Sequence, residues 1–171
     1  MIVNLEALGD EPEYAPIPTE WADGFEWRTL LDIDVIARPR PQGSIRATIN
    51  RSTGRALAVK HNEPQQDAWR SYVRRDALDA LPDGHVAVDC PVRVVIEFVL
   101  VRPKSTPKRA IDPIPAATRP DGDKLERAVW DALGEAGVYR DDSRITSWAG
   151  SKRLARADEP PHARIRVAVP A

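Results

Sequence analysis

The segment between Pro91 and Arg102 constrains the fold more strongly than any other part of the chain. On one face of this segment, every second residue along the chain is apolar: Val92, Val94, Ile96, Phe98 and Leu100. Valines make the other face apolar as well: Val95, Val99 and Val101. A strand with two apolar faces must be covered on both sides, so we expect it inside a sheet. The 171 residues suffice for one compact domain around that sheet.

Two helices and five further strands are expected around this central strand. The first helix opens at Pro64, and its apolar face consists of Trp69, Tyr72, Val73, Ala77 and Leu81. The second helix, 124–136, repeats apolar residues at helical spacing and is stopped by Gly137. The remaining strands are expected at 31–37, at 45–49 and 55–59 as a hairpin, and at 144–154 and 163–169 as a closing pair. This order predicts an α+β fold, in which a small mixed sheet packs with two main helices.

Charge is unevenly distributed along the chain, although the formal net charge is only −1. Residues 1–26 contain seven acidic residues and no Lys or Arg, so residues 27–171 hold all 25 basic residues and the other 19 of the 26 acidic ones. We therefore divide the chain into an acidic, proline-containing leader, 1–26, and a basic domain, 27–171. A basic domain favours a polyanionic partner such as nucleic acid, although a solvated arginine-rich surface has the same composition.

Several classes of protein are disfavoured by the sequence. No apolar run approaches the roughly 20 residues of a membrane-spanning helix, so we expect no membrane partner. Cys90 is the only cysteine, which excludes an internal disulfide and a cysteine-based zinc site. There is no glycine-rich loop of the NTPase type, so we expect no nucleotide cofactor. The N-terminus lacks the pattern of a secretory signal, and we expect a cytoplasmic location.

Ten basic residues are candidates for contacts with DNA. They lie in a Pro-rich turn and the strand after it, in the long loop 102–120, around the second helix and on a late strand: Arg38, Arg40, Arg46, Lys104, Lys108, Arg109, Lys124, Arg140, Lys152 and Arg153. A protein that binds the DNA backbone needs such a spread of cations and few contacts to bases. The alternative for each of them is a solvated position on the rim of the domain.

Acidic pairs stand at both ends of the second helix. Asp121-Gly-Asp123 comes before it, and Asp141-Asp142 follows it. The helix is about 18 Å long, so the pairs can meet only if the chain returns along it, which we assume the strand after Arg144 provides. Carboxylates gathered in one pocket need a cation to relieve their repulsion, and oxygen ligands suit Mg²⁺ or Mn²⁺. Such an ion activates water for phosphodiester hydrolysis.

These acids also have structural interpretations. Asp121 or Asp123 is equally well suited to cap the second helix. Asp141-Asp142-Ser143 is typical of an ordinary turn. The Asp-x-Asp pattern also occurs in metal-dependent sugar transferases, although no nucleotide-sugar pocket is evident in this sequence. Asp131, on the polar side of the helix, is expected to be solvated or salt-bridged.

A longer run around these acids resembles one known family. The run Arg119-Pro-Asp121-Gly-Asp123-Lys-Leu125, continued by Asp131-Ala-Leu133 and by Asp141-Asp142-Ser143, is similar to the RusA family of Holliday junction resolvases, which are common in phages and prophages. The resemblance implies a RusA-like fold and a homodimeric endonuclease, dependent on Mg²⁺ or Mn²⁺, that cuts four-way DNA junctions symmetrically. A catalytically silent protein of the same fold that binds branched DNA is the alternative.

The resemblance also implies roles for particular residues. Asp121, Asp123 and Asp142 are expected to bind the metal and to be catalytic, with Asp141 as a further candidate ligand. Arg127 stands where the family has a lysine, four residues after the second aspartate of the motif. Because a guanidinium does not readily deprotonate, Arg127 is expected to stabilise charge and not to donate a proton.

Overall fold

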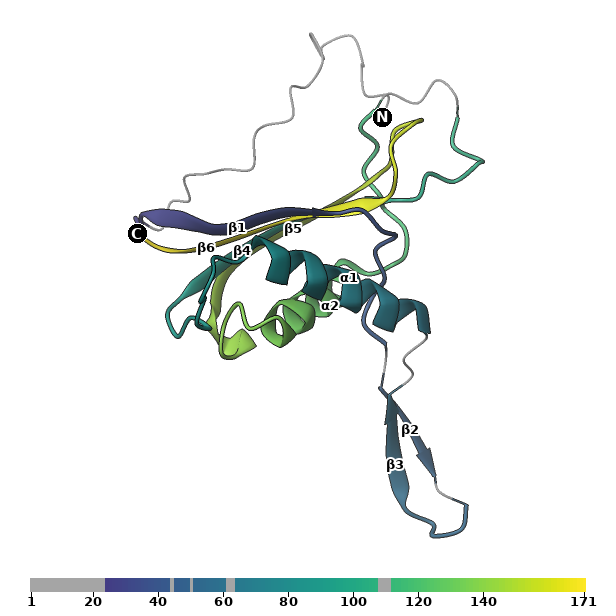
Figure 1. Ribbon diagram of the computed structural model, residues 1–171. Helices are drawn as coiled ribbons and strands as arrows, with labels where there is room; N and C mark the ends of the chain where they lie inside the picture. The colour runs from purple at the N-terminus through teal and green to yellow at the C-terminus, as the bar shows by residue number, and fades with distance from the viewer. Residues whose placement is uncertain (1–23, 44, 50, 61–63, 108–111) are drawn as a thin grey trace.

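A mixed four-stranded sheet forms the body of the protein (Figure 1). The computed structural model describes residues 24–43, 45–49, 51–60, 64–107 and 112–171, without the side chains of 45–48 and 57–60. The sheet has the order β1-β6-β4-β5, and its strands are β1 (Trp27–Val35), β4 (Val92–Leu100), β5 (Ile145–Leu154) and β6 (His162–Pro170). The helices α1 (Pro64–Ala80) and α2 (Gly122–Glu135) lie on one face of this sheet (Figure 1). The arrangement is α+β, as expected.

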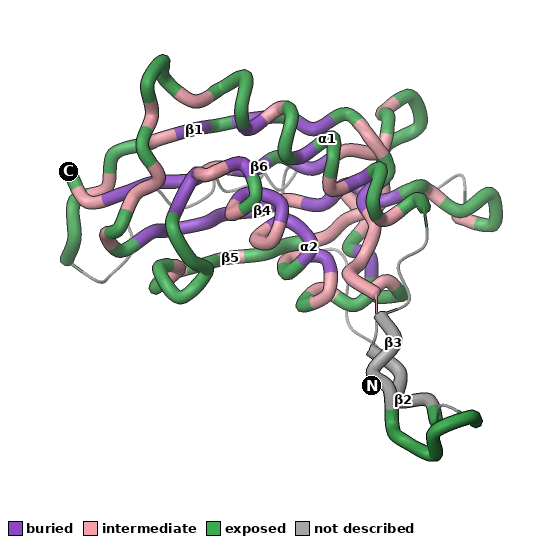
Figure 2. The backbone as a smooth tube through the Cα atoms, turned by 60° about the horizontal axis from the view of Figure 1, so that its bottom comes forward, coloured by how far each residue is buried: buried purple, intermediate pink, exposed green. Residues whose placement is uncertain are grey.

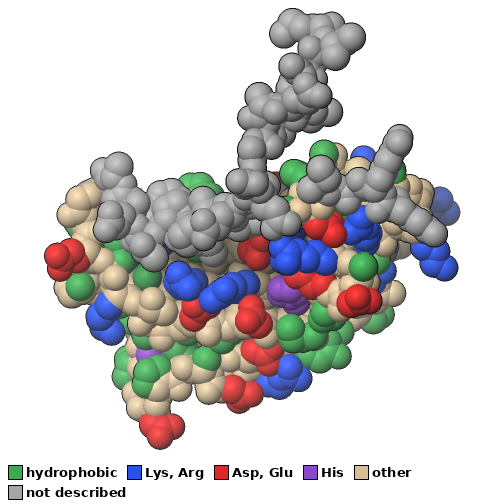
Figure 3. Space-filling model, turned by 90° about the horizontal axis from the view of Figure 1, so that it is seen from above, with side chains coloured by type: hydrophobic (Ala, Val, Ile, Leu, Met, Phe, Trp, Pro, Cys, Tyr) green, Lys and Arg blue, Asp and Glu red, His purple; other side chains and the backbone are tan. Residues whose placement is uncertain are grey.

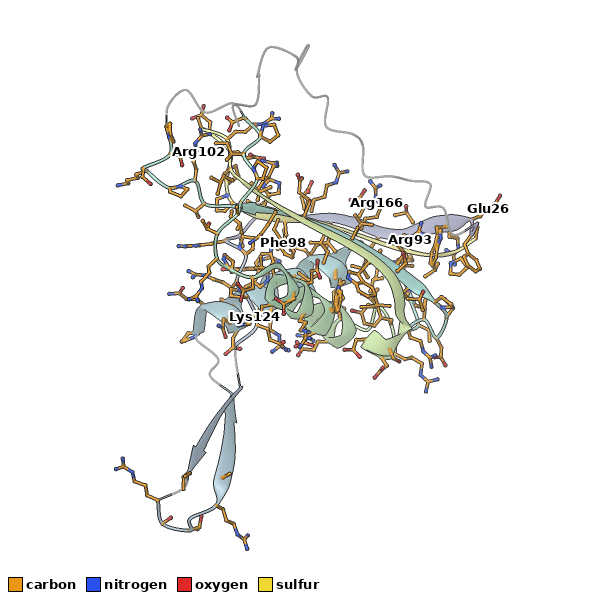
Figure 4. The ribbon with its side chains drawn as sticks, turned by 180° about the vertical axis from the view of Figure 1, so that it is seen from behind. Glu26, Arg93, Phe98, Arg102, Lys124 and Arg166 are labelled. Carbon is orange, nitrogen blue, oxygen red and sulfur yellow. The ribbon has the colours of Figure 1, made fainter. Side chains whose placement is uncertain are left out.

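Strand β4 occupies the interior position that its sequence predicts. It pairs with β6 on one side and with β5 on the other. Every residue of β4 except Glu97 is buried. Phe98 lies on the side of the helices, whereas Arg166 of β6 lies on the opposite face of the sheet (Figure 4). The core therefore lies between β4, its neighbours and the two helices.

The last two strands do not form the expected closing pair. Strand β5 runs parallel to β4 at the edge of the sheet, and β6 lies between β1 and β4, antiparallel to both. The apolar residues of β6 explain its position, because Ala163, Ile165, Val167 and Val169 are all buried. Strand β5 alternates between exposed and half-buried residues over most of its length, which suits an edge.

The two helices bury most of the residues expected on their apolar faces. The expected set of α2 is fully buried: Leu125, Ala128, Val129, Ala132, Leu133 and Ala136. Gly137 follows with a φ of 74°, the left-handed conformation of a residue after a helix. In α1, Trp69, Val73 and Ala77 are buried, but Tyr72 is 42% exposed and Arg75 packs on its ring. The assignment of Tyr72 to the core was therefore wrong.

A separate two-stranded hairpin extends from the body (Figures 1 and 2). It consists of β2 (Ile45–Ile49) and β3 (Ala56–Lys60), which pair antiparallel as expected. Buried residues lie mainly along the four-stranded sheet and on the helix faces turned toward it (Figure 2). Among the described helices, none is long and apolar enough to cross a membrane. Residues 1–23 of the expected leader lie outside the described residues, so its separation from the domain stays a prediction.

Candidate active site

The acidic pair at the start of α2 has exposed carboxylates that make few contacts with the described residues. Asp121 occupies the N-cap position of the helix, but its side chain makes no capping hydrogen bond. Its Oδ2 lies 3.6 Å from the Lys124 Nζ, in an exposed ion pair. Asp123 is exposed in the first turn and makes no hydrogen bond or ion pair with the described part of the chain. Both residues thus lie at the positive end of the helix dipole, as the capping interpretation expects, but Asp121 makes no capping hydrogen bond.

The backbone before Asp121 is held in place by β5. The Lys152 Nζ donates hydrogen bonds to the carbonyl oxygens of Thr118, at 2.7 Å, and of Pro120, at 2.9 Å. The Lys152 carbonyl in turn accepts from the Ala116 N–H at 3.1 Å. Lys152, expected to contact DNA, thus has a structural partner on the loop that leads into the acidic pair.

The Pro-rich turn after β1 is tied to the same helix. The Gln42 backbone N–H donates to the Lys124 carbonyl at 2.8 Å, and the Gln42 Nε2 donates to the Asp131 Oδ2 at 2.7 Å. Asp131 therefore accepts an amide hydrogen bond and forms no salt bridge with a described residue. Gln42 was not singled out in the sequence, because nothing in the pattern of the turn indicates which of its residues reaches α2.

A cleft of about 680 Å³ lies between this turn, the end of β4 and the residues that precede α2. Its charged lining residues are Arg38, Arg40, Arg119, Lys124 and Asp121. Lys124 stands at the start of α2 (Figure 4), so the cleft opens beside the acidic pair. The sequence analysis did not single out Arg119, although it lies directly before the Pro-Asp-Gly-Asp motif. The cleft combines an excess of positive charge with an exposed carboxylate at its edge.

The second acidic pair lies in η2 and the residue before it. The 3-10 helix η2 is formed by Asp142–Arg144, and Asp141 caps it by accepting a hydrogen bond from the Ser143 N–H at 2.9 Å. Hydrogen bonding from Ser143, first from its side chain and then from its backbone N–H, lowers the pKa of the Asp141 carboxyl. The turn interpretation is therefore confirmed for Asp141. Asp142 is exposed, and its carboxylate makes no hydrogen bond or ion pair with a described residue.

The two acidic pairs do not meet within one chain. Strand β5 does return along α2: the rings of Trp148 and Trp130 are 5.7 Å apart, and Lys152 reaches the residue before Asp121. Asp142 precedes this return and stays at the far end of a helix about 21 Å long. Within the described ranges, no group of three or more Asp, Glu, His or Cys residues is placed to hold a metal ion. The assumption that the returning strand gathers the acids is therefore wrong for a single chain.

Asp121 and Asp123 nevertheless fit a hard divalent cation as two of its ligands. Both are exposed carboxylates on either side of a glycine, and oxygen donors of this kind suit Mg²⁺ or Mn²⁺. Burial raises the pKa of the nearby Glu126 carboxyl, and the negative charge of Asp123 raises it further. Asp123 and Glu126 thus repel each other on the first turns of α2, and a bound cation would relieve this repulsion.

Arg127 is exposed on the following turn of α2. Its guanidinium makes no hydrogen bond or ion pair with the residues that the structure describes, Asp123 included. Arg127 therefore does not orient Asp123, and its charge is left for another partner, which is consistent with the expected role in stabilising charge.

The other candidates for DNA contacts divide by their partners. Arg38, Arg40 and Lys124 line the cleft, and Lys104 is exposed on the loop after β4. Arg140 forms an exposed ion pair with Asp89 at 2.8 Å. The side chain of Arg46, and all of Lys108 and Arg109, lie outside the described residues.

Arg153 is different, because two carboxylates surround it. Its side chain is 13% exposed and lies 2.9 Å from Glu97 and 2.6 Å from Glu159. The Glu159 carboxylate also accepts a hydrogen bond from the Arg156 N–H. These contacts give Arg153 a structural role on the sheet and do not fit the expected contact with DNA.

Comparison with known families assigns the chain to one of them. The family model described as Endodeoxyribonuclease RusA matches residues 39–168. The chain belongs to the RusA endodeoxyribonuclease family. The RusA match confirms the resemblance and includes both acidic pairs, Arg127 and most of the cleft, whereas Arg38 and the leader precede it. Membership implies Holliday junction resolvase activity, with branched DNA as the substrate. No curated protein matches the chain.

Proposed function

We propose that this RusA family member is a metal-dependent endonuclease that resolves four-way DNA junctions by phosphodiester hydrolysis. The observation that carries the proposal is a pair of exposed carboxylates beside a basic cleft and within the family match: Asp123 has no side-chain partner among the described residues, and Asp121 has only an exposed ion pair with Lys124 at 3.6 Å. A protein that only binds branched DNA has no need to keep two exposed acids next to the surface that receives a polyanion. The pair therefore favours the enzyme over the catalytically silent alternative.

Asp121, Asp123 and Asp142 would hold one Mg²⁺ or Mn²⁺, with Asp141 beside the third ligand. When bound, this ion supplies an activated water molecule and neutralises charge on the phosphate. Arg127 pairs with the phosphate oxygens as negative charge develops on them, because its guanidinium has no partner among the described residues. Arg127 stays protonated throughout, so the proton for the leaving oxygen comes from water.

The separation of the acids supports a homodimer, provided that one ion needs all three. Because Asp142 lies at the opposite end of α2 from Asp121 and Asp123, its own chain does not complete the ligand set. In a two-fold dimer, Asp142 of the partner subunit completes each site, and two equivalent sites suit a substrate that needs two symmetric cuts. Such a dimer would both complete the ligand set and place two active sites in the symmetry of the junction.

Cleavage of a synthetic four-way junction with Mg²⁺ tests the activity. The parent should cut it, and Asp123→Asn should reduce the rate by about a hundredfold or more, because a bound ion contributes several kcal/mol to the transition state. Asp158→Asn, an exposed aspartate in the turn between β5 and β6, is the matched control and should cut like the parent. A parent that binds junctions without cutting them would support the silent alternative, and an Asp123→Asn variant as fast as the parent would remove Asp123 from the mechanism.

Mixing two inactive variants tests the shared site. In a heterodimer of Asp123→Asn and Asp142→Asn, one site contains both substitutions and the other contains neither, if each site draws on two chains. Equal mixing should then restore about a quarter of the parental number of sites. A mixture as inactive as the separate variants would show that Asp123 and Asp142 act within one chain or not at all.

A further inference from the structure

The side chains of three arginines in the cleft beside Asp121 have no partner within the described part of the chain. Arg38, Arg40 and Arg119 make no hydrogen bond or ion pair with any residue that the structure describes. Other arginines of the domain behave differently: Arg102 pairs with Asp112 at 2.8 Å, and Arg166 pairs with Asp32 at 2.6 Å. The cleft therefore concentrates guanidinium groups whose donors are unused.

The backbone of the turn that carries Arg38 and Arg40 is ordered before any ligand binds. Pro39 and Pro41 each follow an arginine, and a proline restricts the residue before it to extended backbone. Alternate residues of an extended chain project to the same side, so Arg38 and Arg40 flank the buried Pro39 and both line the cleft. The two hydrogen bonds from Gln42 to α2 hold the end of this turn. Because the turn is already ordered, a ligand that binds here loses little free energy to ordering it.

Charge and shape together define the class of ligand. Within the lining, Asp121 is 3.6 Å from Lys124, so the three arginines carry the uncompensated positive charge. The start of α2 adds the positive end of the helix dipole. Apart from Thr118, the remaining walls are aliphatic or proline residues, and no aromatic ring lines the cleft: Pro39, Pro41, Leu100, Val101, Pro103, Pro120 and Leu154. The cleft thus lacks a platform on which bases stack and suits a chain of phosphates and sugars.

We propose that this cleft binds the sugar–phosphate backbone of the strand that is cut, next to the scissile bond. Arg38, Arg40 and Arg119 each contact a phosphate and position the strand against Asp121. The assignment rests on the proposed function and adds to it a defined path for the substrate. Because the contacts are to phosphates, this part of the site recognises the strand without regard to its sequence.

Binding of chemically modified junctions tests the assignment without cleavage. The probe is a four-way junction in which one phosphate at a time near the branch point is replaced by a neutral methylphosphonate, and the protein is the full chain with Asp123→Asn. We expect two or three adjacent replacements to weaken binding about tenfold each. Adding Arg40→Gln, or Arg119→Gln, should weaken binding of the unmodified junction and abolish the effect of one of these replacements, because the arginine and its phosphate form one contact.

Arg28→Gln is the matched control, since Arg28 is an exposed arginine at the opposite end of β1. It should leave both the affinity and the methylphosphonate pattern unchanged. If every methylphosphonate keeps its full effect in both cleft variants, Arg40→Gln and Arg119→Gln, the phosphates bind elsewhere and the proposal is overturned. An Arg40→Gln variant and an Arg119→Gln variant that both bind the unmodified junction as tightly as the parent would also overturn it.

The failure of this proposal is distinct from the failure of the proposed function. A parent that does not cut junctions, yet shows the coupling between arginines and methylphosphonates, keeps the strand path and loses the activity. A parent that cuts, with cleft variants that bind and cut like Arg28→Gln, keeps the activity and loses the strand path. Unfolding midpoints close to the parental value would show that the variants are folded, as expected for exposed or half-buried arginines without partners.

Discussion

At the scale of single residues, Gly150 shows how closely β5 approaches the acidic end of α2. A Cβ atom at this position would overlap the carboxylate of Glu126, which lies against the strand. Because the obstructing atoms are the end of a flexible side chain, we expect Gly150→Ala to displace Glu126 and to cost about 0.5–1 kcal/mol of stability. The same substitution in a Glu126→Ala background should cost almost nothing.

Urea unfolding of the two single variants and the double variant measures this coupling. Gly134→Ala is a useful control, because a Cβ there makes only an ordinary contact of 3.5 Å with Tyr139. It should stabilise α2 by about 0.5–1 kcal/mol through its higher helix propensity. An equal loss for Gly150→Ala with and without Glu126 would contradict the proposed overlap.

Glu159 allows a prediction of pH dependence. Hydrogen bonds from Arg153 lower the pKa of its carboxyl from 4.5 to about 2, although partial burial opposes this shift. Because the pKa is lower in the folded protein, the charged carboxylate stabilises the fold above about pH 4.5, and this contribution is lost as the pH falls toward 2. Glu159→Gln should therefore lower stability by about 1–2 kcal/mol near neutral pH.

The difference between the Glu159→Gln variant and the parent should shrink through the same acid range. Urea unfolding followed at a series of pH values measures it, with Asp158→Asn as the neighbouring control that should follow the parent. A difference that stays constant down to about pH 2 would indicate that packing of Glu159, and not its charge, stabilises the fold.

At the scale of elements, periodicity identified the strands and helices but not all of their neighbours. The apolar residues of α2 and β4 are determined locally, by spacing along the chain, and both elements lie where the sequence predicts them. The partner of a strand is determined by competition for buried positions among distant segments, which explains the misplaced pairing of β5 and β6.

The same distinction applies to the site. The motif identified Asp121, Asp123 and Asp142 as candidate residues, because residue type and spacing can be read from the sequence. It did not show that α2 keeps Asp142 away from the other two, since the direction of the returning strand depends on tertiary packing. The roles of Gln42 and Arg119 also depend on tertiary packing. Gln42 contacts Asp131, which is distant in the chain, and Arg119 lines a cleft that is enclosed by several segments.

Gln42 provides a prediction for the turn between β1 and β2. Gln42→Ala removes the side-chain hydrogen bond to Asp131 and should cost about 1 kcal/mol of stability. Because the turn then holds Arg38 and Arg40 less firmly, the apparent KM for a four-way junction should rise severalfold with little change in kcat. Steady-state cleavage measures both constants, with Gln65→Ala on the exposed side of α1 as the control. A fall in kcat without a change in KM would place Gln42 in the chemical step instead.

At the scale of the whole molecule, the two sides of the domain differ in how their charges are balanced. The face of the sheet opposite the helices carries basic and acidic side chains close together (Figure 3). On it, Asp32 pairs with Arg164 and Arg166, and Glu97 pairs with Arg153. The cleft beside α2 instead carries arginines without acidic partners among the described residues. The attraction for a polyanion is therefore directed to the side that carries Asp121 and Asp123, despite the formal net charge of −1.

This asymmetry predicts a steep dependence of junction binding on salt. If each of the three cleft arginines contacts one phosphate in both subunits of a dimer, the logarithm of the binding constant should fall with the logarithm of the salt concentration with a slope of about −5 or steeper. Affinity should then drop about a thousandfold between about 50 and 200 mM salt. Fluorescence anisotropy of a labelled junction with the Asp123→Asn full chain measures the slope, and junctions of unrelated sequence should share it. A flat response would mean that phosphate contacts contribute little to binding. The cleft arginines would then not be the source of affinity for the junction.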